Sequence, residues 1–473
     1  MNWEAIRRHR GMAAAAGFWI VWHGFLYTHG LFFSTSSKSP LPSFDLWQLL
    51  APSLLREHPF QSLWNLHMQP PLLNAIAAAA LATPAPSRIL WFLFLTIGFA
   101  ASLILYRLLC ERKFPYPCFW TILYIVWPHT WMYQNWFFYT FLVRCLLIAF
   151  LYAYFRRNVF LQCLIASLLP LLRSTFLLPI SIVYICFLCR KEGRWTYSLL
   201  LFLPLAFFVK NIVLFGVPSF SSWMGMNLAA GLHFDERELA EIERLNKLFM
   251  KKNSDCLDEE GNYISILSIT PFSSLDNYQN YIAPRKTGVP CLDEIDSPPD
   301  GVLLHHGKVN YNHIHYVDLS KRYFSETLAW MKKRPFDILS QKFFSLRWGL
   351  TITPASHIFV RNWERGGIID RLIGSFESYT SFSMNNSNLR YSYLFIGMYA
   401  AGIAVLIVQR RKSPALLVFL LAPLALLSID GYEASRTMME FEGVLYPSIL
   451  IAAKITYKGF QSAIAEFLRE ENP

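Results

Sequence analysis

The chain has 473 residues, of which 54% are hydrophobic and only 16% are charged. Soluble domains carry about 25% charged residues, so this chain has too few to coat a soluble surface of its size. The mean hydropathy of +0.30 agrees, and the composition excludes a soluble enzyme, a disordered protein and a fibrous protein. Because apolar stretches recur along the whole chain, we expect an all-α polytopic membrane protein rather than a single-pass receptor.

The net charge of +11 comes from 43 Lys and Arg residues against 32 Asp and Glu residues. In a soluble protein this excess would suggest nucleic-acid binding, but the sequence has no nucleic-acid motif and no basic low-complexity tail. Short basic loops that orient membrane spans explain the excess better. We therefore expect a lipid bilayer as the environment and no nucleic-acid partner.

Ten runs with few or no charged residues predict about ten transmembrane helices. In chain order they cover 12–33, 89–106, 114–133, 135–155, 158–172, 174–189, 195–215, 391–409, 413–429 and 441–457. The first run lacks a clear signal-peptide cleavage site and is predicted to be a signal anchor. The pair 158–172 and 174–189 is the weakest, because both runs are shorter than the roughly 20 residues of a full crossing and one could be a half-helix.

Basic residues mark every second connection between these runs. They are Arg7, Arg8, Arg10, Arg107, Arg112, Lys113, Arg156, Arg157, Arg190, Lys191, Arg194, Arg410, Arg411, Lys412, Lys454 and Lys458. The positive-inside rule then makes both termini cytoplasmic and leaves the connections 34–88, 134, 173, 216–390 and 430–440 outside. This requires that 71–83 does not cross; the run has about 13 residues between prolines and predicts a short helix at the outer interface.

The spans divide the chain into an N-terminal transmembrane module at 1–215, an extracytoplasmic domain at 216–390, C-terminal transmembrane helices at 391–458 and a cytoplasmic tail at 459–473. Within 216–390, helical spacing of apolar residues predicts amphipathic helices over 235–252, 320–333 and 335–348. The stretch 253–318 is rich in Asn, Asp, Ser, Pro and Gly and predicts loops with little regular structure.

Acidic residues are scarce before the extracytoplasmic domain. Residues 1–215 contain only Glu4, Asp45, Glu57, Glu111 and Glu192. By the predicted topology only Asp45 and Glu57 face outward. A carboxylate there could act as a general base or bind a divalent metal such as Mg²⁺ or Mn²⁺, with Asp45 as ligand, or it could simply cap a helix.

Three basic residues lie outside the predicted cytoplasmic connections, so the positive-inside rule does not account for them. Arg144 lies in the middle of a predicted span, Arg173 at an outer turn, and Lys210 toward the outer end of a span. Snorkelling or an internal ion pair would account for them, but cations beside an outer carboxylate would also suit a phosphate-bearing lipid. The loop 430–440, with Glu433 and Arg436, is either an ordinary charged turn or a wall of the same site.

The other candidate motifs are weaker. His305, His306, His313 and His315 do not match a known zinc pattern, although His313 and His315 would share one face of a strand. Cys256 and Cys291 could form a disulfide in an oxidising compartment. No P-loop, GxGxxG, GxSxG, HExxH or CxxC motif is present, which disfavours an ATPase, a dehydrogenase, a serine hydrolase and a zincin.

Several short motifs together resemble the GT-C superfamily of polytopic glycosyltransferases. They include a first outer loop with a lone Asp and then LHMQPPLLN, MYQNWFFYTF, the turn PLLRSTFLLP, the segments KNIVLFGVPSFSSWMGMNL and NYNHIHYVDLSKRY, and EASRTMMEFEGVLYP before the last span. The nearer likeness is to bacterial protein O-mannosyltransferase-like and aminoarabinose transferase-like enzymes. The chain departs from them where Leu46 follows Asp45, where Gln69 replaces a His and where Gln134 replaces an acid.

The resemblance implies inverting transfer of a sugar from a polyprenyl-phosphate donor to a hydroxyl of a glycan, lipid or protein at the outer face of a bacterial inner membrane. Asp45 and Glu57 are then the catalytic candidates, with Asp45 as the base. The implied substrate-binding residues are His67, Gln69, Gln134, Arg144, Arg173, Lys210, Glu433 and Arg436.

Three alternatives remain. An O-antigen ligase or polymerase would rely on outer arginines and a loop histidine rather than on Asp45. A transporter is disfavoured because no inverted repeat is visible and the acidic residues avoid the predicted midplane. A non-catalytic membrane scaffold would explain the missing acidic residues.

Overall fold

The computed structural model describes residues 3–33, 40–42, 49–225, 287–293, 310–333, 367–383 and 390–392. Most of these residues lie in helices, which confirms the predicted helical class. The exception is a two-stranded antiparallel sheet of β1 (Ser381–Ser383) and β2 (Arg390–Ser392). Residues 391 and 392 therefore do not begin a helical span as predicted, and the remaining C-terminal spans, like the helices predicted over 235–252 and 335–348, lie outside the described residues.

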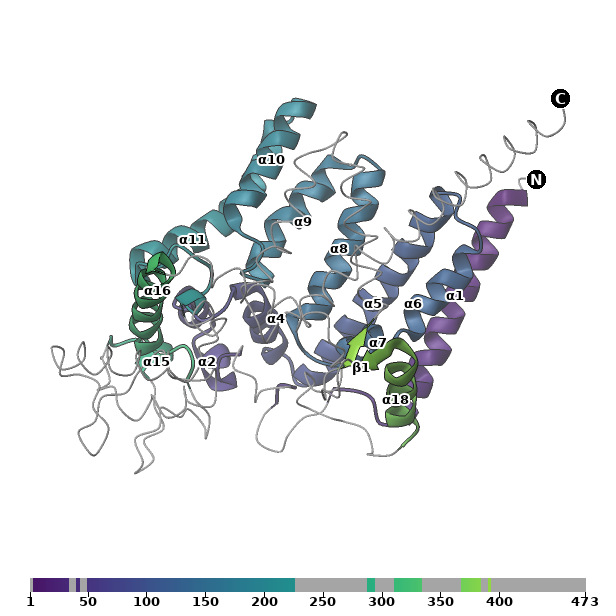
Figure 1. Ribbon diagram of the computed structural model, residues 1–473, viewed down its shortest axis with the longest axis horizontal. Helices are drawn as coiled ribbons and strands as arrows, with labels where there is room; N and C mark the ends of the chain where they lie inside the picture. Colours follow the sequence, from purple (N-terminus) through teal and green to yellow (C-terminus); the bar gives the residue numbers. More distant parts are fainter. Residues whose placement is uncertain are drawn as a thin grey trace.

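Six helices stand side by side and form the body of the structure (Figure 1). They are α1 (Trp3–Thr28), α5 (Pro86–Glu111), α6 (Pro117–Val126), α8 (Tyr139–Phe155), α9 (Val159–Leu172) and α10 (Leu178–Glu192). Direct contacts join α1 to α5 and α6, α5 to α8, α8 to α9, and α9 to α10.

Two helical stretches in the described part are long and apolar enough to cross a membrane, judged by length and composition alone. One is α5, with 26 residues, and the other is the 21-residue stretch Trp195–Phe215. The second stretch combines a 3₁₀ helix, η1 (Trp195–Leu201), with α11 (Phe202–Phe215). Helices α9 and α10 have only 14 and 15 residues, which is about 21–23 Å and shorter than the bilayer core.

The run predicted as one span over 114–133 is not one continuous helix. Helix α6 ends at Val126, and a separate helix α7 (Pro128–Gln134) follows. Pro128 has no N–H to continue the ladder of α6, and it forces the preceding residue out of the helical region. Trp127 accordingly has ψ 122°.

Basic residues meet at one end of the bundle. The hydroxyl of Tyr106 near the end of α5 donates to the carbonyl of Arg8 on α1, at 3.0 Å. Arg156, which caps α8, forms an ion pair of 3.3 Å with Glu111, the last residue of α5. The basic segments around Arg8, Glu111 and Arg156 therefore share one end, as the alternation in the sequence predicts.

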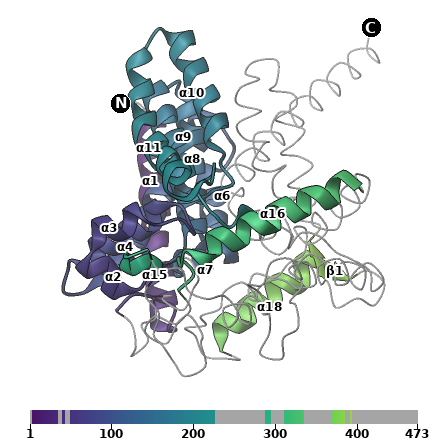
Figure 2. The same cartoon turned by 90° about the vertical axis from the view of Figure 1, so that its left-hand side faces the viewer.

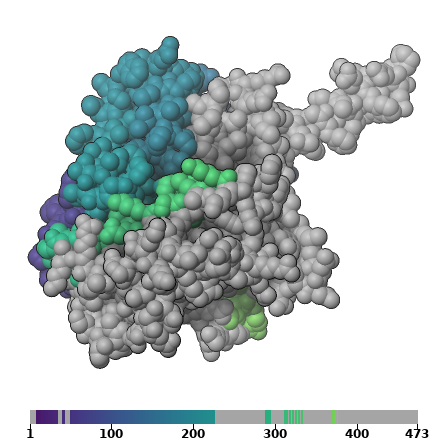
Figure 3. All heavy atoms as spheres, turned by 60° about the vertical axis from the view of Figure 1, so that its left-hand side comes forward, coloured from purple at the N-terminus to yellow at the C-terminus, as the bar shows by residue number. Residues whose placement is uncertain are grey.

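The opposite end carries the short helices of the first long connection and the later segments. These helices are α2 (Pro52–Glu57), α3 (Pro59–Trp64), α4 (Pro71–Leu81), α15 (Pro290–Asp293), α16 (His315–Lys333) and α18 (Ile368–Thr380). Figures 1 and 2 show α2, α4, α15 and α18 beyond this end of the bundle. In Figure 3, α16 runs across the surface next to the helices drawn in teal. Helix α16 confirms the helix predicted for 320–333 but begins at His315, inside the stretch predicted to be irregular.

Helix α4 occupies the stretch predicted to lie at the outer interface. The helix itself is confirmed, but it is packed rather than laid on a surface, because Leu73, Ala77 and Ala80 are buried and it touches α2, α3, α5 and α9. Its Asn74 accepts a hydrogen bond of 2.8 Å from the backbone N–H of Leu50. Helix α4 thus holds the first connection against the bundle.

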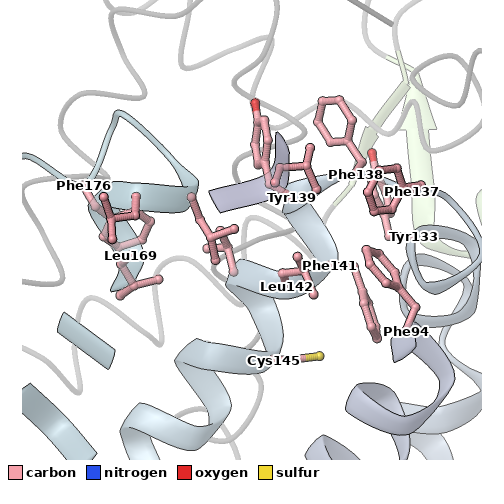
Figure 4. Close-up of a cluster of buried hydrophobic side chains, with 14 of the residues drawn as sticks. Phe94, Tyr133, Phe137, Phe138, Tyr139, Phe141, Leu142, Cys145, Leu169 and Phe176 are labelled. Atoms are coloured by element: carbon pink, nitrogen blue, oxygen red, sulfur yellow. The ribbon is translucent and has the colours of Figure 1, made fainter. Parts of the chain in front are cut away.

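A cluster of buried aromatic rings fixes the beginning of α8 (Figure 4). Phe94 of α5 lies 5.5 Å from Phe137 and 5.6 Å from Phe141, between ring centroids. Trp136 and Phe138 stack at 4.3 Å just before α8 begins. Such ring pairs contribute beyond their buried area, so the cluster gives the polar residues of α7 and α8 a rigid support.

Candidate functional site

His67 is the centre of a buried hydrogen-bond network at the end of the bundle opposite the basic residues. Its Nε2 donates to the carbonyl of Asn312 at 2.8 Å, so its Nδ1 accepts from the hydroxyl of Ser222, also at 2.8 Å. The ring lies 4.9 Å from that of Phe215. Desolvation by burial lowers the pKa of His67 to about 3, so the imidazole is neutral near pH 7 and serves as a structural cross-link.

Asn312 completes this network. Its Oδ1 accepts from the backbone N–H groups of His67 and Met68 at 2.9 and 3.3 Å, while its Nδ2 donates to the carbonyls of Asn65 and Cys291 at 3.2 and 3.4 Å. One fully buried amide therefore joins the first connection to two segments more than 220 residues later. A buried amide with all its partners fixes the register of the segments it joins.

Lys210 of α11 contacts the loop that contains His67. Its ammonium donates to the carbonyl of Leu66 at 2.7 Å and sits 5.5 and 5.4 Å from the ring centroids of Phe207 and Phe215. The residue is only 3% exposed. An ammonium has three N–H bonds, and within the described part of the chain the hydrogen bond to Leu66 uses one of them.

Arg173 occupies the turn after α9. Its guanidinium donates from Nη1 to the hydroxyl of Tyr139, the first residue of α8, and its carbon lies 4.8 Å from the centroid of that ring. Arg173 is 4% exposed. The contact ties the α9–α10 turn to the aromatic cluster, and nothing in the described part joins Arg173 directly to Lys210.

Arg144 extends from α8 toward α7 and α6. Its Nη2 donates to the hydroxyl of Thr130 at 2.8 Å, and its guanidinium lies 5.0 Å from the ring centroid of Tyr124. The residue is 2% exposed, deep for a cation. The break at Trp127 places Thr130 on a separate helix, which allows it to reach this guanidinium.

Gln134, the last residue of α7, is fully buried, and neither its Oε1 nor its Nε2 has a hydrogen-bond partner in the described part of the chain. A Cβ added at Gly98 of α5 would come within 2.5 Å of that Nε2, so the amide rests directly on the glycine backbone. A buried amide without partners costs about 1–3 kcal/mol, which is the kind of cost that functional sites retain.

The remaining predicted residues are scattered. Glu57 ends α2 and is exposed, and Gln69 is half-buried just before α4. Asp45, Glu433, Arg436 and Cys256 lie outside the described residues, so the base, the charged wall and the disulfide stay predictions. Among the described ranges no three His, Cys, Asp or Glu side chains gather as metal ligands, and the expected metal therefore rests on Asp45 alone.

The histidine motif does not form a strand. His313 is fully buried in the turn that precedes α16, and His315 is the first residue of that helix. The two histidines therefore do not share a strand face, and that prediction is wrong. His305 and His306 lie outside the described residues.

The sequence did not single out Asn312, Ser222, Thr130 or Tyr139. Asn312 and Ser222 lie in two segments that the family resemblance marked, but it gave neither of these two residues a role. Their separation from His67, 245 and 155 residues, hides the contact from any local pattern. Comparison with family models, with curated proteins and with solved structures finds no match for this chain.

Proposed function

We propose that the protein is an integral membrane glycosyltransferase that moves a sugar from a polyprenyl-phosphate donor to an acceptor hydroxyl at the outer face, with inversion. The proposal includes ten spans, cytoplasmic termini, an extracytoplasmic domain at 216–390 and residence in a bacterial inner membrane. Its acceptor is a glycan, a lipid or a protein.

The observation that carries this proposal is the burial of three cations near the end of the bundle opposite the basic residues. Arg144, Arg173 and Lys210 are 2%, 4% and 3% exposed. Cations buried among apolar helices are costly and usually functional. A lipid phosphate is a partner that needs both an apolar path for its chain and cations for its head group.

The proposed chemistry is a single displacement. Asp45 removes the proton of the acceptor hydroxyl, whose oxygen then attacks the anomeric carbon. The bond from that carbon to the phosphate oxygen breaks, and the electron pair leaves with the polyprenyl phosphate. Lys210 and Arg173 stabilise the charge that develops on this phosphate, while Gln69 and Gln134 contact the sugar or the acceptor.

The proposal changes the roles that the sequence predicts for His67 and Glu57. His67, expected to line the pocket, acts as a positioning residue, because both its ring nitrogens bond within the protein. Glu57 is a second carboxylate on an exposed helix end and is secondary to Asp45. Glu433 and Arg436 remain the proposed wall of the site.

The purified protein in vesicles of phosphatidylethanolamine and phosphatidylglycerol tests the function directly. With water supplying the hydroxyl in place of the natural acceptor, we expect it to release free sugar and polyprenyl phosphate from synthetic polyprenyl-phosphate sugars, and we expect Asp45→Asn to lower the rate by at least about 100-fold, since general-base catalysis contributes 10²–10⁴-fold. Glu111→Gln is the matched control, because that carboxylate lies at the opposite end and should leave the rate unchanged. Full activity in Asp45→Asn with loss in His313→Ala would favour the ligase alternative.

A second candidate is a non-catalytic membrane scaffold. The specific observation in its favour is that His67, Lys210 and Arg173 each bond to another part of the chain. Mass spectrometry of glycans and lipids from cells with and without the gene separates the two functions. A scaffold predicts no change in any glycan, whereas the transferase predicts one missing sugar.

A further inference from the structure

Helix α3 presents an apolar face that nothing in the described part of the chain covers. The ring of Phe60 is 89% exposed and that of Trp64 is 50% exposed. The two residues are four apart on one helix, so they lie on the same face. Transfer of exposed apolar side chains out of water is favourable, so the exposure of both residues predicts that an apolar environment meets this face.

This face is continuous with one of the stretches that can cross a membrane. The ring of Trp64 lies 6.2 Å from that of Phe207, a residue of α11. Helix α11 itself exposes apolar side chains, among them Phe202 at 76% and Val213 at 74%. Trp64 therefore joins the α3 face to the apolar surface of α11, and whatever solvates that surface also reaches α3.

The charges beside this face fit the boundary of a bilayer. Arg56, Glu57 and His58 immediately precede α3, and all three are exposed. An apolar face bordered by charged residues is the pattern of a segment that lies in the headgroup region. Trp is enriched there, because its side chain combines an apolar ring with a polar N–H.

We propose that α3 is an interfacial anchor whose Phe60 and Trp64 insert into the outer leaflet and set the depth of the first connection. The occupant of this face is lipid rather than a protein partner, because the face continues the surface of α11. The sequence predicts that 71–83 is the helix at the outer interface. In this proposal α3 is that helix, and the buried α4 connects it to the bundle. This inference rests on the membrane-spanning part of the proposed function and not on sugar transfer.

Site-specific photo-crosslinking tests the anchor in the full-length protein. The photoreactive analogue p-benzoylphenylalanine is placed in turn at Phe60, at Phe92 and at Glu57, and the protein is reconstituted in phosphatidylethanolamine–phosphatidylglycerol vesicles. Phe92 is 60% exposed on α5, so it reports whether the bundle itself contacts lipid. Glu57, the exposed last residue of α2 and three positions before Phe60, is the matched control for the aqueous side.

We expect lipid adducts by mass spectrometry at Phe60 and Phe92, with at least about fivefold less at Glu57. Adducts at Phe92 but none at Phe60 would overturn the anchor while leaving the membrane assignment intact. Adducts to a co-purifying protein at Phe60 would overturn it in favour of a protein partner. Absence of adducts at both Phe60 and Phe92 would reject the membrane premise, and sugar transfer in the vesicles, measured separately, would then be judged on its own result.

Discussion

At the scale of single residues, the imidazole of His67 links two other segments of the chain through its two ring nitrogens. Replacing it by Ala leaves the Ser222 hydroxyl and the Asn312 carbonyl without their partner inside the protein. We expect His67→Ala to lower the free energy of unfolding by about 2–4 kcal/mol, since each unsatisfied buried group costs about 1–3 kcal/mol. His58→Ala is the control, because that histidine is exposed and its side chain should contribute less than about 0.5 kcal/mol. Thermal unfolding in detergent measures both, and equal midpoints for the two variants would contradict the cross-link.

The lowered pKa of His67 predicts an acid-sensitive stability. Burial holds the folded-state pKa at about 3, whereas the unfolded chain binds a proton near 6.5. The contribution of neutral His67 is therefore fully present above pH 6.5 and declines as the pH falls toward 3, by at most about 1.4 kcal/mol per pH unit. The stability gap between the wild type and His67→Gln should narrow over this window. A gap that stays constant from pH 7.5 to pH 4 would show that His67 does not titrate in this way.

Gln134 predicts a conflict between stability and function. We expect Gln134→Met to raise the free energy of unfolding by about 1 kcal/mol, because it removes a buried amide that has no described partner, and to lower sugar transfer. Gln162→Met is the matched control, since that buried amide accepts from Tyr184 at 2.7 Å and donates to Ala153 at 3.3 Å. The control should lose stability. A loss of stability in Gln134→Met as well would show that its amide has a partner.

At the scale of elements, the sequence predicts what depends on neighbouring residues and misses what depends on distant ones. Uncharged run length located α5, α8, α9 and α10, and helical spacing located most of α16. The break at Pro128 was visible in the sequence, but the hydropathy of the surrounding run concealed it. The contact of His67 with Asn312 depends on how two loops fold back, and no local pattern contains that information.

The packing of α5 against α7 gives a prediction at this scale. Alanine at Gly98 would place its Cβ 2.5 Å from the amide nitrogen of Gln134, so the helices must separate or the amide must move. We expect Gly98→Ala to cost about 1–3 kcal/mol, as overpacking in a close-packed core does.

Two comparisons isolate this contact. Gly17→Ala on α1 meets no atom within 4 Å and should be neutral or stabilising by up to about 1 kcal/mol through helix propensity. In the Gln134→Ala background, Gly98→Ala should lose most of its cost. If the cost is the same in both backgrounds, the strain arises elsewhere on α5.

At the scale of the whole molecule, the charges divide the bundle into two ends. Arg8, Glu111 and Arg156 meet at one end, whereas the buried Lys210 and the His67 network lie at the other. An aqueous basic surface and a set of buried polar groups have opposite requirements for solvent, and this division supports the proposed topology.

This division predicts the topology of the protein. Alkaline phosphatase, which is active only outside the cytoplasm, should be inactive when fused after Arg112 or Arg157 and active when fused after Glu57 or Gly216. The first pair of positions follows α5 and α8 at the basic end, and the second pair follows α2 and α11 at the opposite end. The fusions after Glu57 and Arg157 are the most informative. If α4 crossed the membrane, every position after α4 would lie on the side opposite to the one predicted here, whereas Glu57 would stay outside. Activity after both Glu57 and Arg157 would therefore place α4 across the membrane and move Lys210 to the inner face, where it could not serve an outer phosphate.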